Sequence, residues 1–370
     1  MSLEHDQPVH VLILGASYGS LFATKLALAG HSAQMVCLPE EAALINQEGT
    51  LVRLPVKGHE GLVEIRSTQL PGKISASVPS KVSLTEFDLV VLAMQEPQYR
   101  APEVRALLKQ VAASRLPTVS IMNMPPLPYL SRIPGLNPAD LAGCYTDASV
   151  WEGFDPGLMT LCSPDPQAFR PADEGLNVLQ VRLPTNFKAA AFGQEAHTQL
   201  LRRLAADIEA VRWPLNGQMV ELPVKLKVHE SIFVPMAKWS MLIAGNYRCI
   251  TPSGMRPIKE AVHGDLEQSR QVYQWVVDLC VKLGASPDDM VPFDKYAAAG
   301  QGLLKPSSAA RALAAGATDI ERIDLLVKLV AEQQGLSNDS VNETVKLVNS
   351  WLERNRKAAA AKKAAEAVAA

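Results

Sequence analysis

The amino-terminal part of the chain alternates between short apolar runs and a helical pattern. Residues 9–14 form an apolar run that ends at Gly15, and residues 33–38 form a second one. Between the two runs, apolar residues recur at helical spacing from Ser20 onward, and Gly30 provides a stop signal. A strand, a helix and a second strand in this order are the unit that builds a parallel sheet.

Further segments of the first half predict elements of the same kind. They are a hairpin-like pair at 50–56 and 61–67, a strand at 87–94, a helix at 101–113 and a strand at 117–122. Residues 124–185 are rich in Pro, Gly and Asp. Their short β-like runs at 158–162 and 178–181 predict either the far side of the same sheet or loops.

Helical patterns dominate the second half. The predicted helices cover residues 197–211, 231–247, 263–283, 307–315, 320–334 and 340–356. Because 370 residues exceed one ordinary core, we predict an α/β fold with two domains, a parallel sheet domain at 1–200 and an all-helical domain at 201–356. Residues 357–370, a low-complexity run of Ala and Lys, predict a frayed helix or a disordered tail.

Composition and charge narrow the class of protein. The net charge is -2, with 20% charged and 48% hydrophobic residues, which is typical of a globular protein and gives no sign of nucleic-acid binding. The five cysteines are scattered without metal-ligand spacing, so we expect no metal site and a reducing compartment. The polar first residues and the lack of a long apolar run predict a cytoplasmic protein without signal peptide or membrane contact.

The turn after the first predicted strand fits two active-site patterns. Gly15-Ala16-Ser17-Tyr18-Gly19 matches the serine-nucleophile pattern G-x-S-x-G, but that site needs a loop from an earlier strand, and only one strand precedes Ser17. The same turn before a helix predicts a loop whose N–H groups bind a pyrophosphate. The predicted cofactor-binding residues of this Rossmann-type domain are Gly15, Ser17, Tyr18, Gly19 and Ser20. The loop reads one residue shorter than G-x-G-x-x-G, so an altered site is the alternative.

Four longer segments follow one another along the chain: "LILGASYGSLFATKLALAGH", "FDLVVLAMQEPQ", "MAKWSMLIAGN" and "SSAARALAAGATDIERIDLL". The first resembles the opening strand, glycine loop and helix of the ketopantoate reductase (2-dehydropantoate 2-reductase) family, and the second resembles its fourth strand. The third resembles the family's W-x-K-x-x-x-N-x-x-x-N helix, and the fourth its S-S-M…T-E-I-D-x-I-N segment. The resemblance spans residues 9–348 in the family's order, although no motif matches in full.

The resemblance implies a nicotinamide-dependent reductase and gives roles to individual residues. Lys238 matches the general acid, and Asn246 matches an asparagine that positions the keto acid. Asp319 falls where the family has a glutamate, and Ser307 or Ser308 falls at its substrate-contacting serine. These three catalytic and two substrate-binding positions are what the resemblance predicts.

Two cofactor contacts come from the same resemblance. Asn123, in "SIMNM", falls at the family's Q-N-G turn, and Gln95 falls where the family has a lysine after strand four.

The chemistry of carbonyl reduction agrees with the role of Lys238, because hydride transfer to a ketone leaves negative charge on oxygen that an ammonium stabilises and protonates. The spacing to Asn246 places both residues on one helical face, slightly more than two turns apart.

Each of these residues also has a purely structural interpretation. A lysine in an apolar stretch, such as Lys238, is typical of a side chain that extends its ammonium to solvent. Asn246 before Tyr247 fits a helix C-cap, and Thr318 with Asp319 fits an N-cap for the helix at 320. The apolar face of the Lys238 helix is predicted to be core rather than a cofactor site, and its residues are Met236, Trp239, Leu242 and Ile243.

The departures from the family concern the cofactor and the substrate. Leu38 stands where the family has the arginine that binds the extra phosphate of NADP, and Glu40 and Glu41 follow closely. The resemblance implies NADP as the cofactor, but without this arginine the choice stays open and NAD is not excluded. Leu242 replaces the first asparagine of the lysine helix, and Arg322-Ile323-Asp324 replaces Y-I-N, which predicts a substrate other than ketopantoate.

These observations predict an oxidoreductase that reduces a 2-oxo acid or a related carbonyl compound. We expect a homodimer formed through the helical half, because apolar helices such as 272–283 exceed what a small domain buries. One alternative is an opine-type dehydrogenase, which would need a His–acid pair such as His229-Glu230. The other is a non-catalytic dinucleotide-binding or sensor protein, which the substitutions at Leu38, Gln95 and Leu242 would suit.

Overall fold

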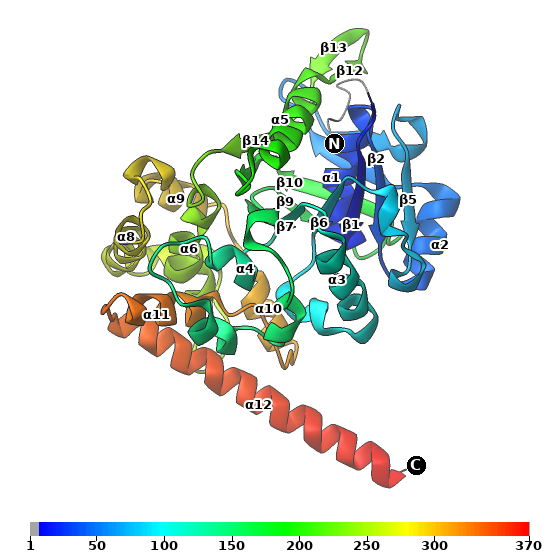
Figure 1. The fold of residues 1–370 in the computed structure, drawn as a ribbon. Coiled ribbons are helices and arrows are strands. Elements are labelled where there is room, and N and C mark those ends of the chain that lie inside the picture. The colour runs from blue at the N-terminus through cyan, green and yellow to red at the C-terminus, as the bar shows by residue number, and fades with distance from the viewer. Residues whose placement is uncertain (1–6, 370) are drawn as a thin grey trace. The chain divides into compact units, whose positions relative to one another are not determined.

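The computed structural model describes residues 7–369 and divides the chain into two compact units (Figure 1). Unit 1 comprises the described residues up to Met94 together with Gln98–Arg132 and Ser149–Pro235, and unit 2 comprises Gln95–Pro97, Ile133–Ala148 and the chain from Met236 onward. Residues 1–6, on which the prediction about a signal peptide partly rests, lie outside the described residues, as does the last residue of the predicted tail.

Unit 1 is built on a mostly parallel sheet of eight strands within the described part of the chain. In spatial order the strands are β14 (Leu226–His229), β11 (Phe187–Ala190), β8 (Met159–Ser163), β7 (Thr118–Ile121), β6 (Leu89–Leu92), β1 (His10–Leu14), β2 (Ser32–Val36) and β5 (Ile74–Ser77). All neighbouring pairs are parallel except β8 with β11. The predicted parallel sheet is confirmed.

The apolar runs explain why these strands are central. β1 and β6 are buried along almost their whole length, as expected for parallel strands that helices cover on both faces. β1 pairs with β2 on one side and with β6 on the other, so the chain reverses its direction of winding between β1 and β6. In open α/β sheets, such a reversal marks the edge at which ligands bind.

A second sheet of four strands packs on the other side of α1 (Ala16–Leu28). Its order is β4 (Leu62–Arg66), β3 (Leu51–Pro55), β10 (Val178–Leu183) and β9 (Gln167–Phe169). The predicted hairpin is confirmed as β3 with β4. Of the two β-like runs with open assignment, 158–162 lies in the large sheet and 178–181 lies in this one. Because α1 contacts both sheets, almost all of its side chains are buried.

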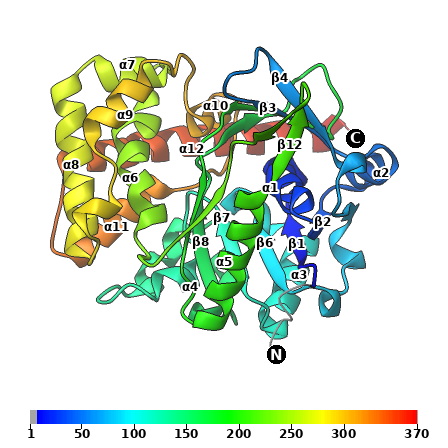
Figure 2. The ribbon, with the colours of Figure 1, turned by 90° about the horizontal axis from the view of Figure 1, so that it is seen from above.

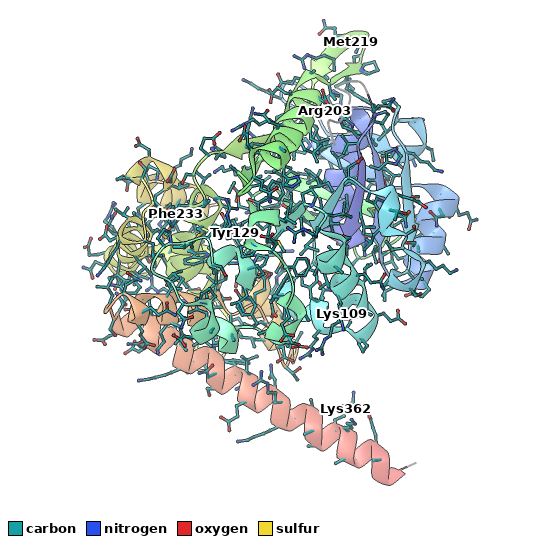
Figure 3. The ribbon with its side chains drawn as sticks, viewed as in Figure 1. Lys109, Tyr129, Arg203, Met219, Phe233 and Lys362 are labelled. Carbon is teal, nitrogen blue, oxygen red and sulfur yellow. The ribbon has the colours of Figure 1, made fainter. Side chains whose placement is uncertain are left out.

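The remaining elements of unit 1 are α2 (Pro39–Glu48), α3 (Pro102–Ser114), α4 (Leu127–Leu130), α5 (Glu195–Ala210) and the hairpin β12 (Arg212–Leu215) with β13 (Gln218–Glu221). Met219 marks the hairpin in Figure 3 and is exposed. α5 packs on β14 and α1, so it belongs to unit 1 although its pattern resembles the later helices. The continuous carboxyl-terminal part of unit 2 therefore begins at Met236, whereas the predicted boundary was near residue 200.

Lys25 is buried on α1, where its ammonium donates to the carbonyl oxygen of Pro223 at 3.0 Å. Burial lowers the pKa of Lys25 to about 7; the charge of Lys225 adds to this, and the carboxylates of Glu209 and Glu221 oppose it. Between this value and the ordinary 10.5, the folded chain has released the proton while the unfolded chain retains it. The contribution of Lys25 to stability therefore rises with pH through this window.

Lys25→Met should remove this pH dependence. The free energy of unfolding of the native protein, relative to that of the variant, is expected to rise with pH above 7, approaching about 1.4 kcal/mol for each pH unit between pH 8 and 9. Urea denaturation of both proteins at several pH values measures the difference. Parallel stability curves would contradict the assignment of a neutral Lys25 to the folded state above pH 7.

Unit 2 is helical within the described residues. Its helices are α6 (Lys238–Met241), α7 (Ile258–His263), α8 (Leu266–Lys282), α9 (Phe293–Gly300), α10 (Ser308–Ala314), α11 (Ile323–Gln333) and α12 (Asp339–Ala369). α6, α7, α8 and α9 pack together (Figure 2). The predicted helix at 263–283 is interrupted, because Asp265 caps α8 by accepting a hydrogen bond from the N–H of Gln268 at 2.9 Å. α9 was not predicted.

Two features of unit 2 differ from the sequence-based picture. The segment Ile133–Ala148 belongs to it and contacts α11, although the prediction gave these residues to the sheet domain. Val272, Val276 and Leu279 on α8 are buried within the chain itself, so excess apolar surface does not support a dimer. The tail continues α12 as an exposed helix, on which Figure 3 labels Lys362.

Candidate functional site

Gly15 forms the turn between β1 and α1 at the point where the sheet reverses its winding. Its φ of 106° lies in the region that glycine adopts without strain. A Cβ atom at this position would lie 2.5 Å from Cγ of Met94 and 2.8 Å from the carbonyl oxygen of Ala93, which follow β6. Only glycine therefore allows the turn to lie directly against the end of β6.

Backbone hydrogen bonds hold three strand ends together around this turn. The N–H of Gly15 donates to the carbonyl of Val36 at the end of β2 (2.9 Å), and the N–H of Ala93 donates to Leu14 at the end of β1 (2.8 Å). α1 begins at Ala16, so the N–H groups of its first turn have no acceptor within the helix. Ser17 in this turn is exposed. The turn thus leaves backbone N–H groups available as hydrogen-bond donors at the carboxyl edge of the sheet.

Gly19 explains the shortened glycine pattern. A Cβ atom there would lie 2.7 Å from Cγ2 of Ile13, so Gly19 is the residue that lets α1 pack closely on β1. In G-x-G-x-x-G the third glycine has this packing role, and here it comes one position earlier. Ser20, at the position of that third glycine, is buried, and its hydroxyl donates to the carbonyl of Ser17 at 2.9 Å.

The side chain of Tyr18 has a structural partner. Its hydroxyl donates to the carbonyl oxygen of Pro166 at 2.7 Å, and its ring meets Phe187 edge to face at 5.9 Å. Burial raises the pKa of Tyr18 well above its ordinary value. The hydroxyl is therefore engaged in anchoring the segment before β9, and a contact of Tyr18 with a cofactor would come from its backbone N–H.

The other two predicted cofactor residues follow neighbouring strands. Asn123 is partly buried and comes two residues after β7, which pairs with β6. Gln95 is exposed and follows Met94 in the chain. β1, β6 and β7 are parallel neighbours, so Gly15, Met94 and Asn123 all follow strand ends at the same edge of the sheet.

The helix with Lys238 and Asn246 is less regular than predicted. Lys238 begins α6, and a π-helical turn follows at Leu242–Asn246. In a regular α-helix, eight residues leave an offset of about 80° from a common line. A π turn rotates less per residue, so it brings Lys238 and Asn246 closer to one line along the helix. The predicted core face is confirmed, since Met236, Trp239, Leu242 and Ile243 are all buried.

Three residues fix this wide turn. The hydroxyl of Tyr296 on α9 donates to the carbonyl of Met241 at 3.0 Å, and a Cβ atom at Gly245 would collide with that hydroxyl. Ser307 donates to the carbonyl of Asn246 at 2.7 Å and accepts a hydrogen bond from the N–H of Ala310 at 3.2 Å as the N-cap of α10. Ser307 thus joins α10 to the end of the turn, while its neighbour Ser308 is exposed.

Ser307→Ala should therefore lower stability, because it removes both the cap of α10 and the bond to the π turn. The expected loss in the free energy of unfolding is about 1–2 kcal/mol. Ser308→Ala is the matched control, in an exposed position one residue later, and should change stability by less than about 0.5 kcal/mol. Chemical denaturation of both variants measures the difference. Equal losses would contradict the role assigned to Ser307.

Asp319 does not cap a helix, because α11 begins only at Ile323. Its carboxylate accepts hydrogen bonds from Arg356 on α12 at 2.8 Å and from the Thr318 hydroxyl at 3.0 Å. The N-cap interpretation of Thr318 and Asp319 is therefore wrong. The structure also gives Asp319 a salt-bridge partner that the sequence did not indicate.

Within the departure Arg322-Ile323-Asp324, the two charged residues form an ion pair. Arg322 binds Asp324 through two hydrogen bonds of 3.0 Å, and the side chain of Asp324 is fully buried. Burial raises the pKa of Asp324, and Arg322 opposes this shift. Tyr247, next to Asn246, donates to the carbonyl of Glu321, so this segment packs against the end of the π turn.

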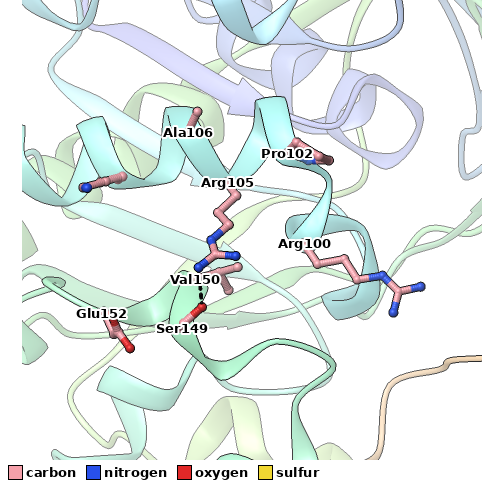
Figure 4. A pocket seen from close by; sticks show the side chains of 8 residues that line it. Arg100, Pro102, Arg105, Ala106, Ser149, Val150 and Glu152 are labelled. Carbon is pink, nitrogen blue, oxygen red and sulfur yellow. Dashed lines mark hydrogen bonds between the residues drawn. The ribbon is translucent and has the colours of Figure 1, made fainter.

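A separate groove of about 450 Å³ lies in unit 1 (Figure 4). Its lining residues are Arg100, Pro102, Arg105, Ala106, Lys109, Ser149, Val150 and Glu152. Arg105 crosses it to donate to the hydroxyl of Ser149 at 2.8 Å. None of the residues predicted for the site lines this groove.

Among residues 7–369, no helix combines the length and the hydropathy that a membrane span requires. Across the same residues, no cluster of three or more His, Cys, Asp or Glu side chains is placed to hold a metal ion.

The fold is that of the ketopantoate reductases, as the motifs predicted. No family model and no curated protein matches the sequence. The structure of 2-dehydropantoate 2-reductase from Methylococcus capsulatus matches 94% of this chain and 97% of that one, with a TM-score of 0.64 at 13% identity. At such identity, the likeness concerns the fold.

Two further solved structures share this fold. A ternary structure of D-mandelate dehydrogenase with NADH and anilino(oxo)acetate matches 94% of this chain and 100% of that one, with a TM-score of 0.62 at 13% identity. A dimeric ketopantoate reductase from Staphylococcus aureus matches with the same coverage, a TM-score of 0.55 and 12% identity.

Proposed function

We propose that the protein is an oxidoreductase that reduces a 2-oxo acid, or a related carbonyl compound, with NADH or NADPH. The observation that supports this proposal most strongly is the Gly15 turn. It lies where the sheet reverses its winding between β1 and β6, it leaves no space for a side chain at Gly15, and it starts a helix of 13 residues. A dinucleotide pyrophosphate fits such a turn, because it needs N–H donors, a helix dipole and close backbone approach.

The glycine turn expected to bind the cofactor belongs to unit 1, and Lys238, expected to act on the substrate, belongs to unit 2. A bound nicotinamide would supply the hydride that adds to the carbonyl carbon of the substrate. Lys238 would donate the proton from Nζ to the carbonyl oxygen, so that a 2-oxo acid and a proton become a 2-hydroxy acid as the cofactor is oxidised. Lys238 is partly buried at the start of α6, and its helix is held by the bonds of Tyr296 and Ser307.

Three further residues would orient the substrate. Asn246 is partly accessible at the end of the π turn, and Ser308 is exposed at the start of α10. Asp319 would act while bound to Arg356, which holds its carboxylate in place. Leu242, where the family has an asparagine, is buried, so it removes a polar contact instead of lining an apolar pocket.

A homodimer remains part of the proposal. Its support is the dimeric ketopantoate reductase from Staphylococcus aureus, whose fold this chain shares. The opine-type alternative would depend on His229 and Glu230, and Glu230 is an exposed residue that forms an ion pair with Arg202 on α5. The sensor alternative differs from the enzyme in one testable respect, which is turnover.

The test is the oxidation of NADH and NADPH by the purified protein in the presence of a panel of 2-oxo acids. The panel should range from pyruvate and ketopantoate to aromatic acids such as benzoylformate. Absorbance at 340 nm should fall with at least one member, and the product should be the 2-hydroxy acid. Saturable cofactor binding without turnover on any carbonyl compound would favour the sensor and contradict the reductase.

A further inference from the structure

The start of α2 is the place where this fold distinguishes the two nicotinamide cofactors. α2 follows β2, and in dinucleotide-binding sheets the residues after this strand contact the adenosine ribose. Here the N-cap residue is Leu38, with 63% of its surface exposed and no charge to offer a phosphate. Any cation at this point must come from another part of the chain.

A segment distant in the sequence supplies such a cation. Arg170, directly after β9, forms an ion pair with Glu41 in the first turn of α2, across 129 residues of sequence. Near the other end of β9, the carbonyl of Pro166 accepts the hydroxyl of Tyr18 from the first turn of α1. The segment 166–170 therefore connects the helix start expected to bind pyrophosphate with the helix start expected to meet the ribose.

The chain after Arg170 is anchored along α2. Arg53 on β3 binds Glu174 with both nitrogens of its fork, and the side-chain amide of Asn177 donates to the carbonyl of Gly49 at 2.8 Å. Gly49 is the C-cap of α2. Because this loop is attached at both ends of one helix, the guanidinium of Arg170 is held beside the first turn.

The charges around the first turn of α2 favour a ribose that carries no 2′-phosphate. The side chain of Glu41 is 8% exposed and that of Arg170 is 24% exposed, so the pair lies at the surface of the turn with the guanidinium outermost. Burial raises the pKa of the Cys37 thiol at the end of β2 to about 12, with Glu41 adding to the shift and Arg170 opposing it. Both charges thus act at the end of β2, and exposed Glu40 adds a second carboxylate in the same turn.

We infer that the Arg170–Glu41 pair, together with Glu40, sets the cofactor preference and makes the chain bind NAD(H) more tightly than NADP(H). The inference rests on the proposed function. A 2′-phosphate would have to compete with Glu41 for the guanidinium and lie near a second carboxylate, which disfavours a dianion. The 2′- and 3′-hydroxyls of NAD are donors, and carboxylates accept hydrogen bonds from them.

The test is a titration of the full chain with NADH and NADPH, followed by quenching of tryptophan fluorescence at fixed ionic strength. The native protein should bind NADH at least about tenfold more tightly than NADPH. Glu41→Gln releases the guanidinium and removes a charge, so affinity for NADPH should rise about tenfold with little change for NADH. Glu40→Gln, at an exposed position, should shift the ratio in the same direction by a few-fold even if Glu41→Gln folds poorly.

Glu48→Gln is the matched control, since Glu48 is exposed at the far end of the same helix and should leave the ratio unchanged. Tighter binding of NADPH by the native protein would overturn the inference. So would an unchanged ratio in both Glu40→Gln and Glu41→Gln while their melting temperatures remain native. If the native protein binds neither cofactor, the proposed function fails and this inference fails with it, whereas binding with the opposite preference overturns this inference alone.

Discussion

Lys238→Met should reduce turnover of the best carbonyl substrate by about 10²–10⁴-fold, the usual contribution of a positioned general acid. Methionine is unbranched and similar in length, so it preserves the packing of the aliphatic part of the side chain while it removes the proton donor. Cofactor affinity should stay within a few-fold of the native value, because the glycine turn belongs to unit 1 and Lys238 to unit 2. Steady-state kinetics and a cofactor titration separate the two effects.

The matched control is Lys259→Met, which removes a lysine that is exposed on α7 of the same unit. It should retain native turnover and stability. If Lys238→Met turns over as fast as this control, Lys238 is a surface lysine and the proposed proton donor must be sought elsewhere. If Lys238→Met loses activity only in proportion to its loss of folded protein, the effect is structural and the role as general acid is contradicted.

Gly15→Ala should abolish cofactor binding and destabilise the fold. The substitution forces a left-handed backbone on alanine, which costs about 1–2 kcal/mol. It also places Cβ 2.8 Å from the carbonyl oxygen of Ala93, and backbone cannot rotate away as a side chain can. Relief of this contact would shift the end of β6 and the first turn of α1, and overpacking of this kind costs about 1–3 kcal/mol more.

Gly58→Ala separates the two causes. Gly58 also has a positive φ, 79°, but no atom lies within 4 Å of a Cβ built there. This control should show only the backbone cost and should bind cofactor normally. Thermal melting and cofactor titration compare the pair. Equal stability losses with intact cofactor binding in both variants would contradict the close approach of the Gly15 turn to β6.

The sequence predicted those parts of the structure that depend on local patterns. The apolar runs at 9–14 and 87–94 identified two central strands, and the order of motifs identified the fold. Boundaries were less accurate where a short polar turn interrupts a helical pattern, as at Asp265. The assignment of α5 to the helical half failed because a surface helix on a sheet has the same periodicity as one in a bundle.

Long-range contacts in the candidate site could not be predicted. No local signal relates Arg170 to Glu41, since only tertiary folding brings the two together. Two local signals did not enter the prediction. Gly245 lies within a helical pattern, where a glycine often marks an irregular turn, and Arg322 and Asp324 carry opposite charges two residues apart.

The central claim is that the Gly15 turn binds a nicotinamide dinucleotide, and isothermal titration of the native protein with NADH and with NADPH tests it most directly. The account predicts saturable binding of one molecule per chain, with a dissociation constant below about 1 mM for NADH and its loss in Gly15→Ala. Absence of binding to both cofactors by a folded native protein would contradict the account. Binding that persists unchanged in Gly15→Ala would contradict it as well.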